Sequence, residues 1–272
     1  MQIFSASPGV MFTSVWRNRA LIAALIKREV IGRYRGSFMG ILWSFFNPIV
    51  MLSIYTFVFS FIFKSRWVGA GDSKSEFALI LFAGLMVFNL FSECVTRAPN
   101  LIISNANYVK KVVFPLEILP CVIAGASLFH ALVSLIVWTV AYWIVFGMPP
   151  VTMFYLPVVI APLLLIILGL SWGLAALGVY MRDVAHFIGL VTSGLMFLAP
   201  IFYPATAVAE EYRWMLQLNP LTAAVENVRS VLFFGQQPDW QVLGIYSCVG
   251  VLVACLGFAF FQKTRKGFAD VL

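Results

Sequence analysis

Residues 155–180 read YLPVVIAPLLLIILGLSWGLAALGVY and contain no Asp, Glu, Lys or Arg. They belong to a longer run of 64 uncharged residues, 118–181. A helix that crosses a bilayer needs roughly 20 apolar residues, because it rises about 1.5 Å per residue through about 30 Å of hydrocarbon. The run is therefore too long for one crossing, and the turn signal GMPP at 147–150 divides it. It predicts two membrane spans, at 118–146 and 155–180.

The rest of the chain follows the same pattern. Of its 272 residues, 62% are hydrophobic and only 11% are charged, whereas soluble domains contain about 25% charged residues. This composition excludes a soluble enzyme, a disordered chain and a secreted disulfide scaffold. The fold class is therefore all-α, a polytopic membrane protein with six transmembrane helices in a single domain, 1–272. The other four predicted spans are 38–63, 77–92, 184–203 and 240–262.

The basic residues indicate how these spans are oriented. With six spans, both termini lie on one side, and that side carries 13 of the 18 Lys and Arg residues. Cytoplasmic loops are enriched in Lys and Arg, so we expect a multi-pass protein with cytoplasmic N- and C-termini. The net charge of +7 is then mainly an orientation signal, and we expect no nucleic-acid partner.

Residues 15–35 place Ile22, Leu25, Ile26 and Val30 at helical spacing, with basic side chains on either side. Apolar residues at these intervals line one face of a helix, and such a helix lies in the membrane interface. The alternative is a flexible basic lead-in that only obeys the positive-inside rule. Because the periodicity continues for more than two turns, we favour an amphipathic cytoplasmic helix.

Residues 98–114 form a polar segment with two lysines, Lys110 and Lys111, before a span that begins with Pro115 and Pro120. Proline near a helix start is tolerated, because the missing N–H would have no partner there. The segment is either an ordinary cytoplasmic loop or a short transverse helix that docks on a cytoplasmic partner.

The outer connection 205–239 is too apolar for a plain loop and too charged to span. Asn219 and Pro220 divide it into two short helical pieces. A re-entrant hairpin in the outer leaflet fits this mixture, since non-helical backbone at depth is tolerated where protein covers it. A pair of helices on the outer surface fits about equally well.

The sequence contains little that could perform catalysis. Its two histidines, His130 and His186, have no acidic or thiol partners at metal-ligand spacing, and no GxxxxGK[ST] phosphate loop is present. His130 lies in mid-span and is either a proton relay or, more commonly, a hydrogen-bonding partner of a neighbouring helix. No span carries paired carboxylates, which argues against an ion-coupled carrier or an intramembrane enzyme. We expect a transport permease that binds no cofactor itself.

Aromatic residues are abundant in the first and fifth spans. Trp43, Phe46 and Tyr55 lie deeper than an interfacial belt would require. Such rings offer an apolar face, with a polar atom in Trp and Tyr, and this suits the C–H face and hydroxyls of a sugar, although packing against lipid is the commoner role. Separately, Gly169 and Gly173 form a small-xxx-small pattern that would allow two helices to approach closely.

Several motifs together resemble a known family. The run KREVIGRYRGSFMGILW at 27–43, followed by Pro48, resembles the opening of ABC-2 type permeases that export polysaccharides. The nearest members are the membrane subunits of O-antigen, capsule and teichoic-acid exporters. Residues 107–120 are similar to the family's coupling segment, and YMRD at 180–183 is similar to its turn between spans four and five. APIFYP at 199–204 and NPL at 219–221 match its exit region.

The resemblance implies an assembly that composition does not show. It implies a homodimer that pairs with two copies of a separate cytoplasmic ATPase, which would bind ATP and Mg. Residues 15–35 would rest beside that ATPase, and the coupling contacts would be Tyr108, Lys110, Lys111, Arg28 and Glu29. Spans one and five would line a pore between protomers, with candidate glycan contacts at Trp43, Phe46, Tyr55, Phe197 and Tyr203. Residues 205–239 would form the outer gate, with Asn219 and Pro220 at its centre.

The expected function is that of a permease subunit in the bacterial inner membrane, part of an ABC exporter for a lipid-linked, O-antigen-like polysaccharide. Membrane lipids and the glycan are then its further partners. An ABC-2 exporter of a drug or a lipid is the alternative within the same fold, and it should have fewer aromatic residues in spans one and five. An ion-coupled carrier or an intramembrane enzyme is a more distant alternative.

Overall fold

The computed structural model describes residues 7–58, 74–110 and 114–272. In these ranges every regular element is helical and no strand occurs, which confirms the all-α prediction. The α-helices are α1 Pro8–Arg17, α2 Arg19–Arg33, α3 Trp43–Phe57, α4 Lys74–Arg97, α5 Ala106–Lys110, α6 Leu119–Phe146, α7 Leu156–Tyr180, α8 Val184–Leu198, α9 Arg213–Leu218, α10 Thr222–Leu232, α11 Trp240–Thr264 and α12 Phe268–Val271. Short 3-10 turns are η1 Gly40–Leu42, η3 Ala98–Asn100, η4 Ile103–Asn105, η5 Leu116–Ile118, η6 Val151–Tyr155, η7 Ala205–Ala207, η8 Glu210–Tyr212 and η9 Arg265–Gly267.

Five described helical segments are long and apolar enough to cross a membrane, against the six that the sequence predicts. They are Gly40–Phe57, Ser75–Asn100, Leu116–Phe146, Val151–Tyr180 and Trp240–Val271. The sixth predicted span, 184–203, corresponds to α8, an apolar helix of 15 residues. It is about 22 Å long and ends at Leu198, because Pro200 follows closely and cannot continue a helix.

The second predicted span, 77–92, is shorter than the observed helix, which extends to Arg97. Glu93 and Arg97 marked the end of the span in the sequence, but they are partners within α4 and with α2, so they continue the helix. The first predicted span, 38–63, is helical from Trp43 to Phe57 after η1, and its end lies outside the described residues.

The two segments that were predicted to be cytoplasmic also differ in detail from their predictions. The segment 15–35 is divided at Asn18 between α1 and α2. Ile22 and Leu25 of α2 are buried against Ile118 and Val122, so the apolar face covers the start of α6. The segment 98–114 contains η3, η4 and α5 rather than one transverse helix, and residues 111–113 lie outside the described ranges.

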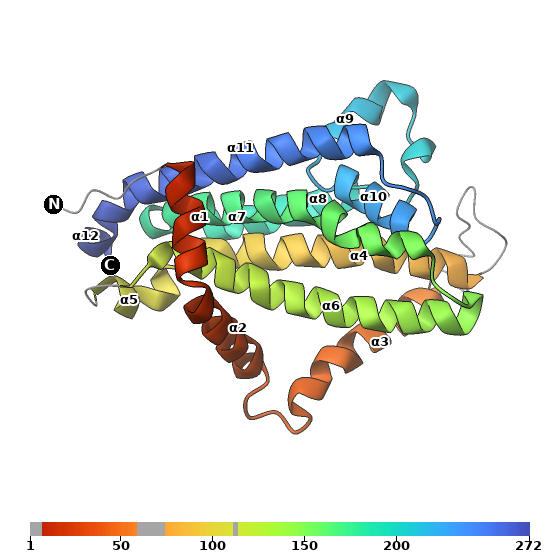
Figure 1. Ribbon diagram of the computed structural model, residues 1–272, viewed down its shortest axis with the longest axis horizontal. Helices are drawn as coiled ribbons and strands as arrows, with labels where there is room; N and C mark the ends of the chain where they lie inside the picture. Colours follow the sequence, from red (N-terminus) through yellow and green to blue (C-terminus); the bar gives the residue numbers. More distant parts are fainter. Residues whose placement is uncertain (1–6, 59–73, 111–113) are drawn as a thin grey trace.

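Helix α4 occupies the middle of the bundle (Figure 1). It contacts α3, α6, α7, α8 and α10, and 83% of its most apolar stretch is buried. Such a helix must be apolar on nearly all sides. Of its side chains between Ser75 and Arg97, only Asn89 is exposed.

Helices α7 and α11 run side by side along the bundle (Figure 1) and approach closely at small residues. A Cβ on Gly169 would lie 2.4 Å from the carbonyl oxygen of Val253, and one on Gly257 would lie 2.0 Å from that of Gly169. Gly173 has nothing within 4 Å of such a Cβ. The close approach of two helices that the sequence predicts is therefore present between α7 and α11. Gly169 of α7 and Gly257 of α11 allow it, whereas Gly173 does not take part.

The first and last described helices, α1 and α12, lie at one end of the bundle, here called the terminal end (Figure 1). The buried Glu117 carboxylate joins α1 to η9, just before α12, since it accepts a hydrogen bond from Ser14 at 2.8 Å and pairs with Arg265 at 2.6 Å. At the opposite end, here called the far end, the rings of Tyr155 and Trp240 meet at 5.7 Å, where α7 and α11 begin.

At the far end, α10 is inserted into the bundle against α4 and α7, while α9 is mostly exposed. The sequence predicts two short helices separated by Asn219 and Pro220, and both are present as α9 and α10. Helix α10 is buried in the bundle, whereas α9 is mostly exposed. Arg229 of α10 is 1% exposed. Its guanidinium donates to the carbonyl oxygens of Ile80, Pro200 and Ile201. It thus joins α10 to α4 and to the end of α8.

Candidate functional site

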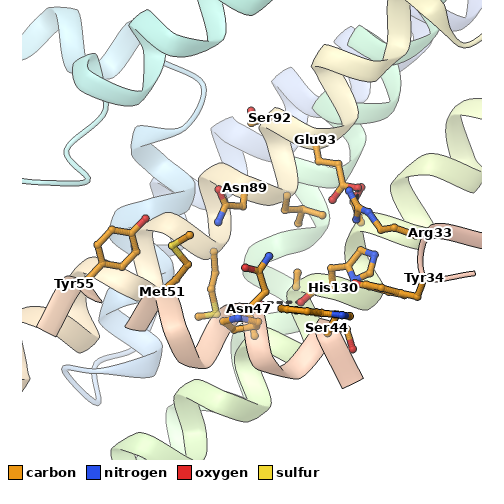
Figure 2. A pocket seen from close by; sticks show the side chains of 17 residues that line it. Arg33, Tyr34, Ser44, Asn47, Met51, Tyr55, Asn89, Ser92, Glu93 and His130 are labelled. Atoms are coloured by element: carbon orange, nitrogen blue, oxygen red, sulfur yellow. Dashed lines mark hydrogen bonds and ion pairs between the residues drawn. The ribbon is translucent and has the colours of Figure 1, made fainter. Parts of the chain in front are cut away.

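A pocket of about 620 Å³ lies between α3, α4 and α6, next to the end of α2 (Figure 2). This volume is within the usual range for small-ligand sites, about 300–1,000 Å³. Polar side chains are unusually frequent in its wall, given that three apolar helices form it. The lining residues are Arg33, Tyr34, Trp43, Ser44, Asn47, Pro48, Met51, Tyr55, Met86, Asn89, Leu90, Ser92, Glu93, Ser127, His130, Ala131 and Ser134.

The pocket combines amides, hydroxyls and aromatic rings. Asn47 of α3 and Asn89 of α4 both line it, and each amide can donate and accept hydrogen bonds (Figure 2). Trp43 contributes an indole ring that meets Phe46 edge to face, with ring centroids 5.4 Å apart. Polar groups between membrane helices are costly unless they have partners, so such a concentration marks a functional site. Its chemistry suits an uncharged ligand rich in hydroxyl groups.

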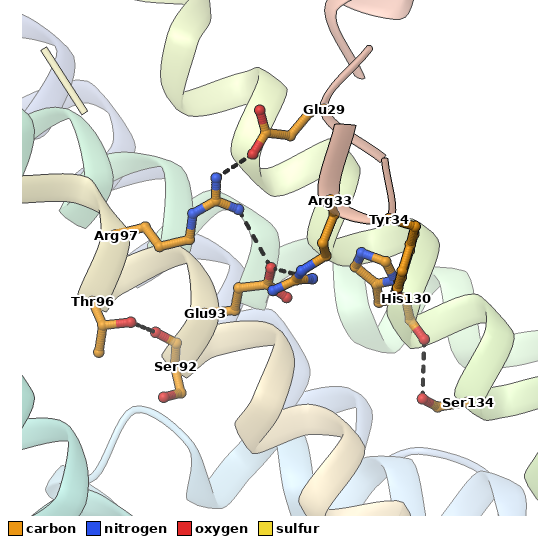
Figure 3. Close-up of polar contacts among 9 residues, drawn as sticks. All are labelled: Glu29, Arg33, Tyr34, Ser92, Glu93, Thr96, Arg97, His130 and Ser134. Atoms are coloured by element: carbon orange, nitrogen blue, oxygen red, sulfur yellow. Dashed lines mark hydrogen bonds and ion pairs between the residues drawn. The ribbon is translucent and has the colours of Figure 1, made fainter. Parts of the chain in front are cut away.

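Charged residues border the pocket on the side of α2 (Figure 3). The Arg33 guanidinium pairs with Glu93 at 2.8 Å, and the same carboxylate oxygen lies 3.4 Å from Arg97. Arg97 also pairs with Glu29. The two positive and two negative charges balance, so the pocket carries no excess charge from this group.

Tyr34 and His130 lie next to these charges (Figure 3). The Tyr34 hydroxyl lies 3.5 Å from His130 Nδ1, and the two rings are edge to face at 5.9 Å. Burial raises the pKa of the Tyr34 phenol. The positive charge of Arg33 acts to lower this pKa, and the negative charge of Glu93 acts to raise it further. The phenol therefore stays protonated at neutral pH. His130 has a hydrogen-bonding neighbour on another element, which agrees with the commoner of the two roles that the sequence allows.

The structure separates the five predicted glycan contacts. Trp43 and Tyr55 line the pocket, and Phe46 contacts it only through Trp43. Phe197 and Tyr203 lie beyond α4, at the end of α8. There the Tyr203 hydroxyl donates to the carbonyl oxygens of Phe197 and Leu198, at 3.2 and 3.3 Å. These two residues are therefore not part of the pocket.

The structure also brings together part of the predicted coupling group. Arg28 donates to the Tyr108 hydroxyl at 3.0 Å, and the Tyr108 ring stacks on Phe114 with centroids 4.2 Å apart. Lys110 is exposed at the end of α5. The predicted contact Lys111 lies outside the described residues.

Asn219 and Pro220, the predicted centre of the outer gate, are held from two sides. The buried Asn219 amide donates to the carbonyl oxygen of Leu195 at 3.4 Å, while its own oxygen accepts from the Leu221 N–H at 2.9 Å. The Pro220 carbonyl oxygen accepts from the Tyr246 hydroxyl at 2.5 Å. The turn between α9 and α10 is thus tied to α8 and α11.

Among the residues that the structure describes, no group of three or more His, Cys, Asp or Glu side chains is arranged to hold a metal ion. The geometry is that of a membrane bundle with a polar pocket and a charged terminal end. The sequence matches the ABC-2 type transporter family over residues 20–233. The chain belongs to this family.

Named relatives of this ABC-2 chain match nearly its whole length. The O-antigen export system permease protein RfbA of Myxococcus xanthus is 27% identical over 258 residues, 94% of this chain and 96% of the relative. The protein of the same name from Klebsiella pneumoniae is 26% identical, over 93% of this chain and 95% of the relative. The capsule polysaccharide export inner-membrane protein CtrC of Neisseria meningitidis is 23% identical, over 94% of this chain and 96% of the relative. The resemblance seen in the motifs is thereby confirmed.

Most of the polar residues that line the pocket of this ABC-2 chain were not among the residues predicted from the sequence. A signal for them exists, because Asn89, Ser92, Glu93 and Thr96 occupy positions i, i+3, i+4 and i+7 of the sequence. At this spacing they share one face of α4. A polar stripe on an otherwise apolar span predicts a surface that faces something other than lipid.

Proposed function

We propose that the chain is the permease subunit of an exporter that moves a lipid-linked polysaccharide out of the bacterial cytoplasm. The observation that carries the proposal is the polar, aromatic pocket between apolar spans, in a chain whose full-length relatives are O-antigen export permeases. Rings such as Trp43 and amides such as Asn47 and Asn89 are groups that bind sugars. We place the protein in the inner membrane, with the terminal end in the cytoplasm.

The course of the chain supports a sixth crossing by α8. Helix α7 ends at the terminal end, where the Tyr180 hydroxyl donates to the Thr264 carbonyl oxygen at 2.7 Å. Helix α11 begins at the far end, beside Tyr155. The chain between Tyr180 and Trp240 must therefore return across the bundle, and α8 is the apolar helix that follows α7 directly. Six crossings place both termini on one side, in agreement with the distribution of basic residues.

The terminal end supplies the surface for the ATPase. It carries α2, α5 and α12 together, with exposed basic side chains such as Arg28 and Lys110. The Arg28–Tyr108 hydrogen bond joins α2 to the coupling segment, so both would respond to the same partner. Glu29 and Lys111 complete the proposed coupling group. ATP and Mg would be bound by the partner subunit.

The exposure of α3 and α8 supports a homodimer. Only 6% of the membrane-spanning part of α3 is buried within this chain, and Thr192 is the one buried residue of α8. A second copy facing these helices would enclose a path between protomers, lined by Phe46 and Phe197, with Tyr203 and the turn at Asn219 and Pro220 at its outer end.

The energy source is tested with purified proteins in liposomes. We expect the permease alone to hydrolyse no ATP, and its complex with the cognate ATPase to hydrolyse ATP and export lipid-linked glycan. Hydrolysis by the permease alone would contradict the proposal. Export of a drug or a lipid in place of the glycan would favour the alternative substrate class.

The role of the pocket in export is tested by replacing both Trp43 and Tyr55 with alanine. We expect the variant to assemble with the ATPase as the wild type does and to export less glycan. Trp143, exposed on α6 and outside the pocket, provides a matched control. Trp143→Ala should leave export unchanged. Unchanged export in the Trp43→Ala, Tyr55→Ala variant would show that the pocket does not contact the glycan.

A further inference from the structure

Four charged side chains are joined by ion pairs between α2 and α4 (Figure 3). Glu29 and Arg33 are four residues apart on α2, and Glu93 and Arg97 are four residues apart on α4. Residues at this spacing lie on one helix face, so the two pairs face each other. Arg97 pairs with Glu29 and with Glu93, and Arg33 pairs with Glu93. We call Glu29, Arg33, Glu93 and Arg97 the four-charge cluster.

The cluster has one half in the pocket and one half outside it. Arg33 and Glu93 line the pocket, whereas Glu29 and Arg97 do not. Beside Glu29, Arg28 binds the Tyr108 hydroxyl in α5. Ion pairs therefore lead from the pocket to Glu29 of α2, and the next residue in the chain, Arg28, binds the coupling segment.

The cluster also attaches the second half of α2, together with the buried side chain of Val30. The first half is fixed by apolar contacts, since Ile22 and Leu25 pack on Ile118 and Val122 in a small cluster of buried residues. Towards its end, α2 is joined to α4 by the ion pairs. These side chains are partly exposed, with 45% for Arg33 and 19% for Glu93. Partly exposed ion pairs contribute little net free energy, so another polar ligand can replace them.

We propose that the pocket is a sensing site for one uncharged sugar residue, and that the four-charge cluster reports its occupancy to α2. This inference rests on the proposed function. Adjacent sugar hydroxyls can donate to the Glu93 carboxylate and accept from the Arg33 guanidinium, and the Trp43 ring can cover the C–H face. The balanced charge of the cluster favours a neutral sugar over a phosphate group.

The shared oxygen of Glu93 explains how occupancy is passed on. One oxygen, Oε1, contacts both Arg33 and Arg97. A sugar hydroxyl at this oxygen competes with both arginines. It weakens the Arg33–Glu93 pair, which joins the end of α2 to α4, and it frees Arg97 from its contact with Glu93 within α4. Coupling between two sites is reciprocal, so a partner that moves α2 through Arg28 and Tyr108 changes the affinity of the pocket in return.

The test uses the reconstituted permease–ATPase complex and the source bacterium's own lipid-linked polysaccharide, extracted from its membranes. The ATPase rate is measured as a function of glycan concentration. We expect the glycan to stimulate the wild-type complex. Arg97→Gln removes the Arg97–Glu29 pair, the tie between α4 and α2 that lies outside the pocket, without changing a side chain that lines the pocket. The stimulation of the ATPase rate should then fall to less than half of the wild-type value. The glycan concentration that gives half-maximal stimulation should change by less than about fivefold, which is the lower end of typical coupling between two sites.

Two further variants make the result decisive. Glu29→Gln removes the other partner of the Arg97–Glu29 pair and should reduce the stimulation as well, so it decides the matter if Arg97→Gln does not assemble. Arg19→Gln, an exposed arginine of α2 outside the cluster, should be stimulated like the wild type. Full stimulation of the Glu29→Gln or Arg97→Gln complex overturns the inference. Export by a wild-type complex that the glycan does not stimulate also overturns it but leaves the proposed function intact, whereas absence of export refutes the proposed function itself.

Discussion

Replacing Arg229 with methionine tests how α10 is held in the bundle. Arg229 is 1% exposed, and its Nε donates to the Ile80 carbonyl oxygen at 3.1 Å. One terminal nitrogen donates to the Ile201 carbonyl oxygen at 2.6 Å, and the other donates to that of Pro200. Methionine keeps an unbranched apolar side chain and removes only the charged head. The substitution therefore isolates the guanidinium contacts.

The size of the effect follows from which carbonyl groups lose their donor. Ile80 lies within α4 and keeps its intrahelical hydrogen bond. Pro200 and Ile201 follow the end of α8, where the guanidinium is a principal donor. Each buried carbonyl left without a donor costs about 1–3 kcal/mol. Burial lowers the pKa of Arg229 to about 10, so removing a charge that is costly to bury offsets part of this loss. We expect a net destabilisation of about 2–4 kcal/mol.

The assay is thermal unfolding of the purified protein in detergent. One kcal/mol shifts the unfolding temperature by about 2–4 °C in proteins of about this size, so Arg229→Met should lower it by about 4–16 °C. Arg213→Met is the control, because Arg213 makes an exposed pair with Glu210 worth about 0–1 kcal/mol. If Arg229→Met unfolds at the temperature of the Arg213→Met control, the guanidinium does not hold α10 and the reasoning is refuted.

Three further predictions use the same unfolding assay. Gly169→Ala should lower the unfolding temperature, because its Cβ would lie 2.4 Å from a carbonyl oxygen of α11. Gly173→Ala should not lower it, because nothing lies within 4 Å of its Cβ. Equal unfolding temperatures for the two variants would contradict the close approach of α7 and α11 at Gly169. Burial raises the pKa of Glu226 in the folded protein. The wild type should therefore gain stability relative to Glu226→Gln as pH falls from 7 towards the pKa of about 4.3 that the group has in the unfolded chain. A stability difference that does not depend on pH would contradict this prediction. Tyr246→Phe removes the donor to the Pro220 carbonyl oxygen and should cost about 1–3 kcal/mol; an unchanged unfolding temperature would show that the turn is held by other contacts.

The parts of the fold that composition controls could be predicted closely. Helices α6 and α7 begin within one residue of their predicted starts at 118 and 155, because a long run without charge and one proline-glycine turn define them. The end of α4 could not be predicted in this way. Glu93 and Arg97 end the uncharged run and so look like the boundary of a span, but Glu and Arg are good helix formers and pair with each other within α4 and with α2, so the helix continues.

The candidate site was predicted less well, for a physical reason. Aromatic content pointed to Trp43 and Tyr55, which line the pocket, but equally to Phe197, which lies beyond α4. Composition shows that a span is rich in aromatic rings, whereas a pocket depends on which helix faces meet. That information lies in the spacing of the polar residues, such as Asn89 and Ser92, rather than in their number.

The polar stripe of α4 has a consequence for how the pocket can change. Arg33 and Glu93 form part of the pocket wall and at the same time fix the end of α2. Under the proposed function, a substitution at Glu93 that adapts the pocket to another sugar would therefore also alter the attachment of α2 and, through Arg28, the proposed coupling segment. Asn47 and Asn89 also line the pocket but take no part in the ion pairs with α2, so changes there would leave this attachment intact. A change at Glu93, in contrast, would need a compensating change at Arg33 or Arg97.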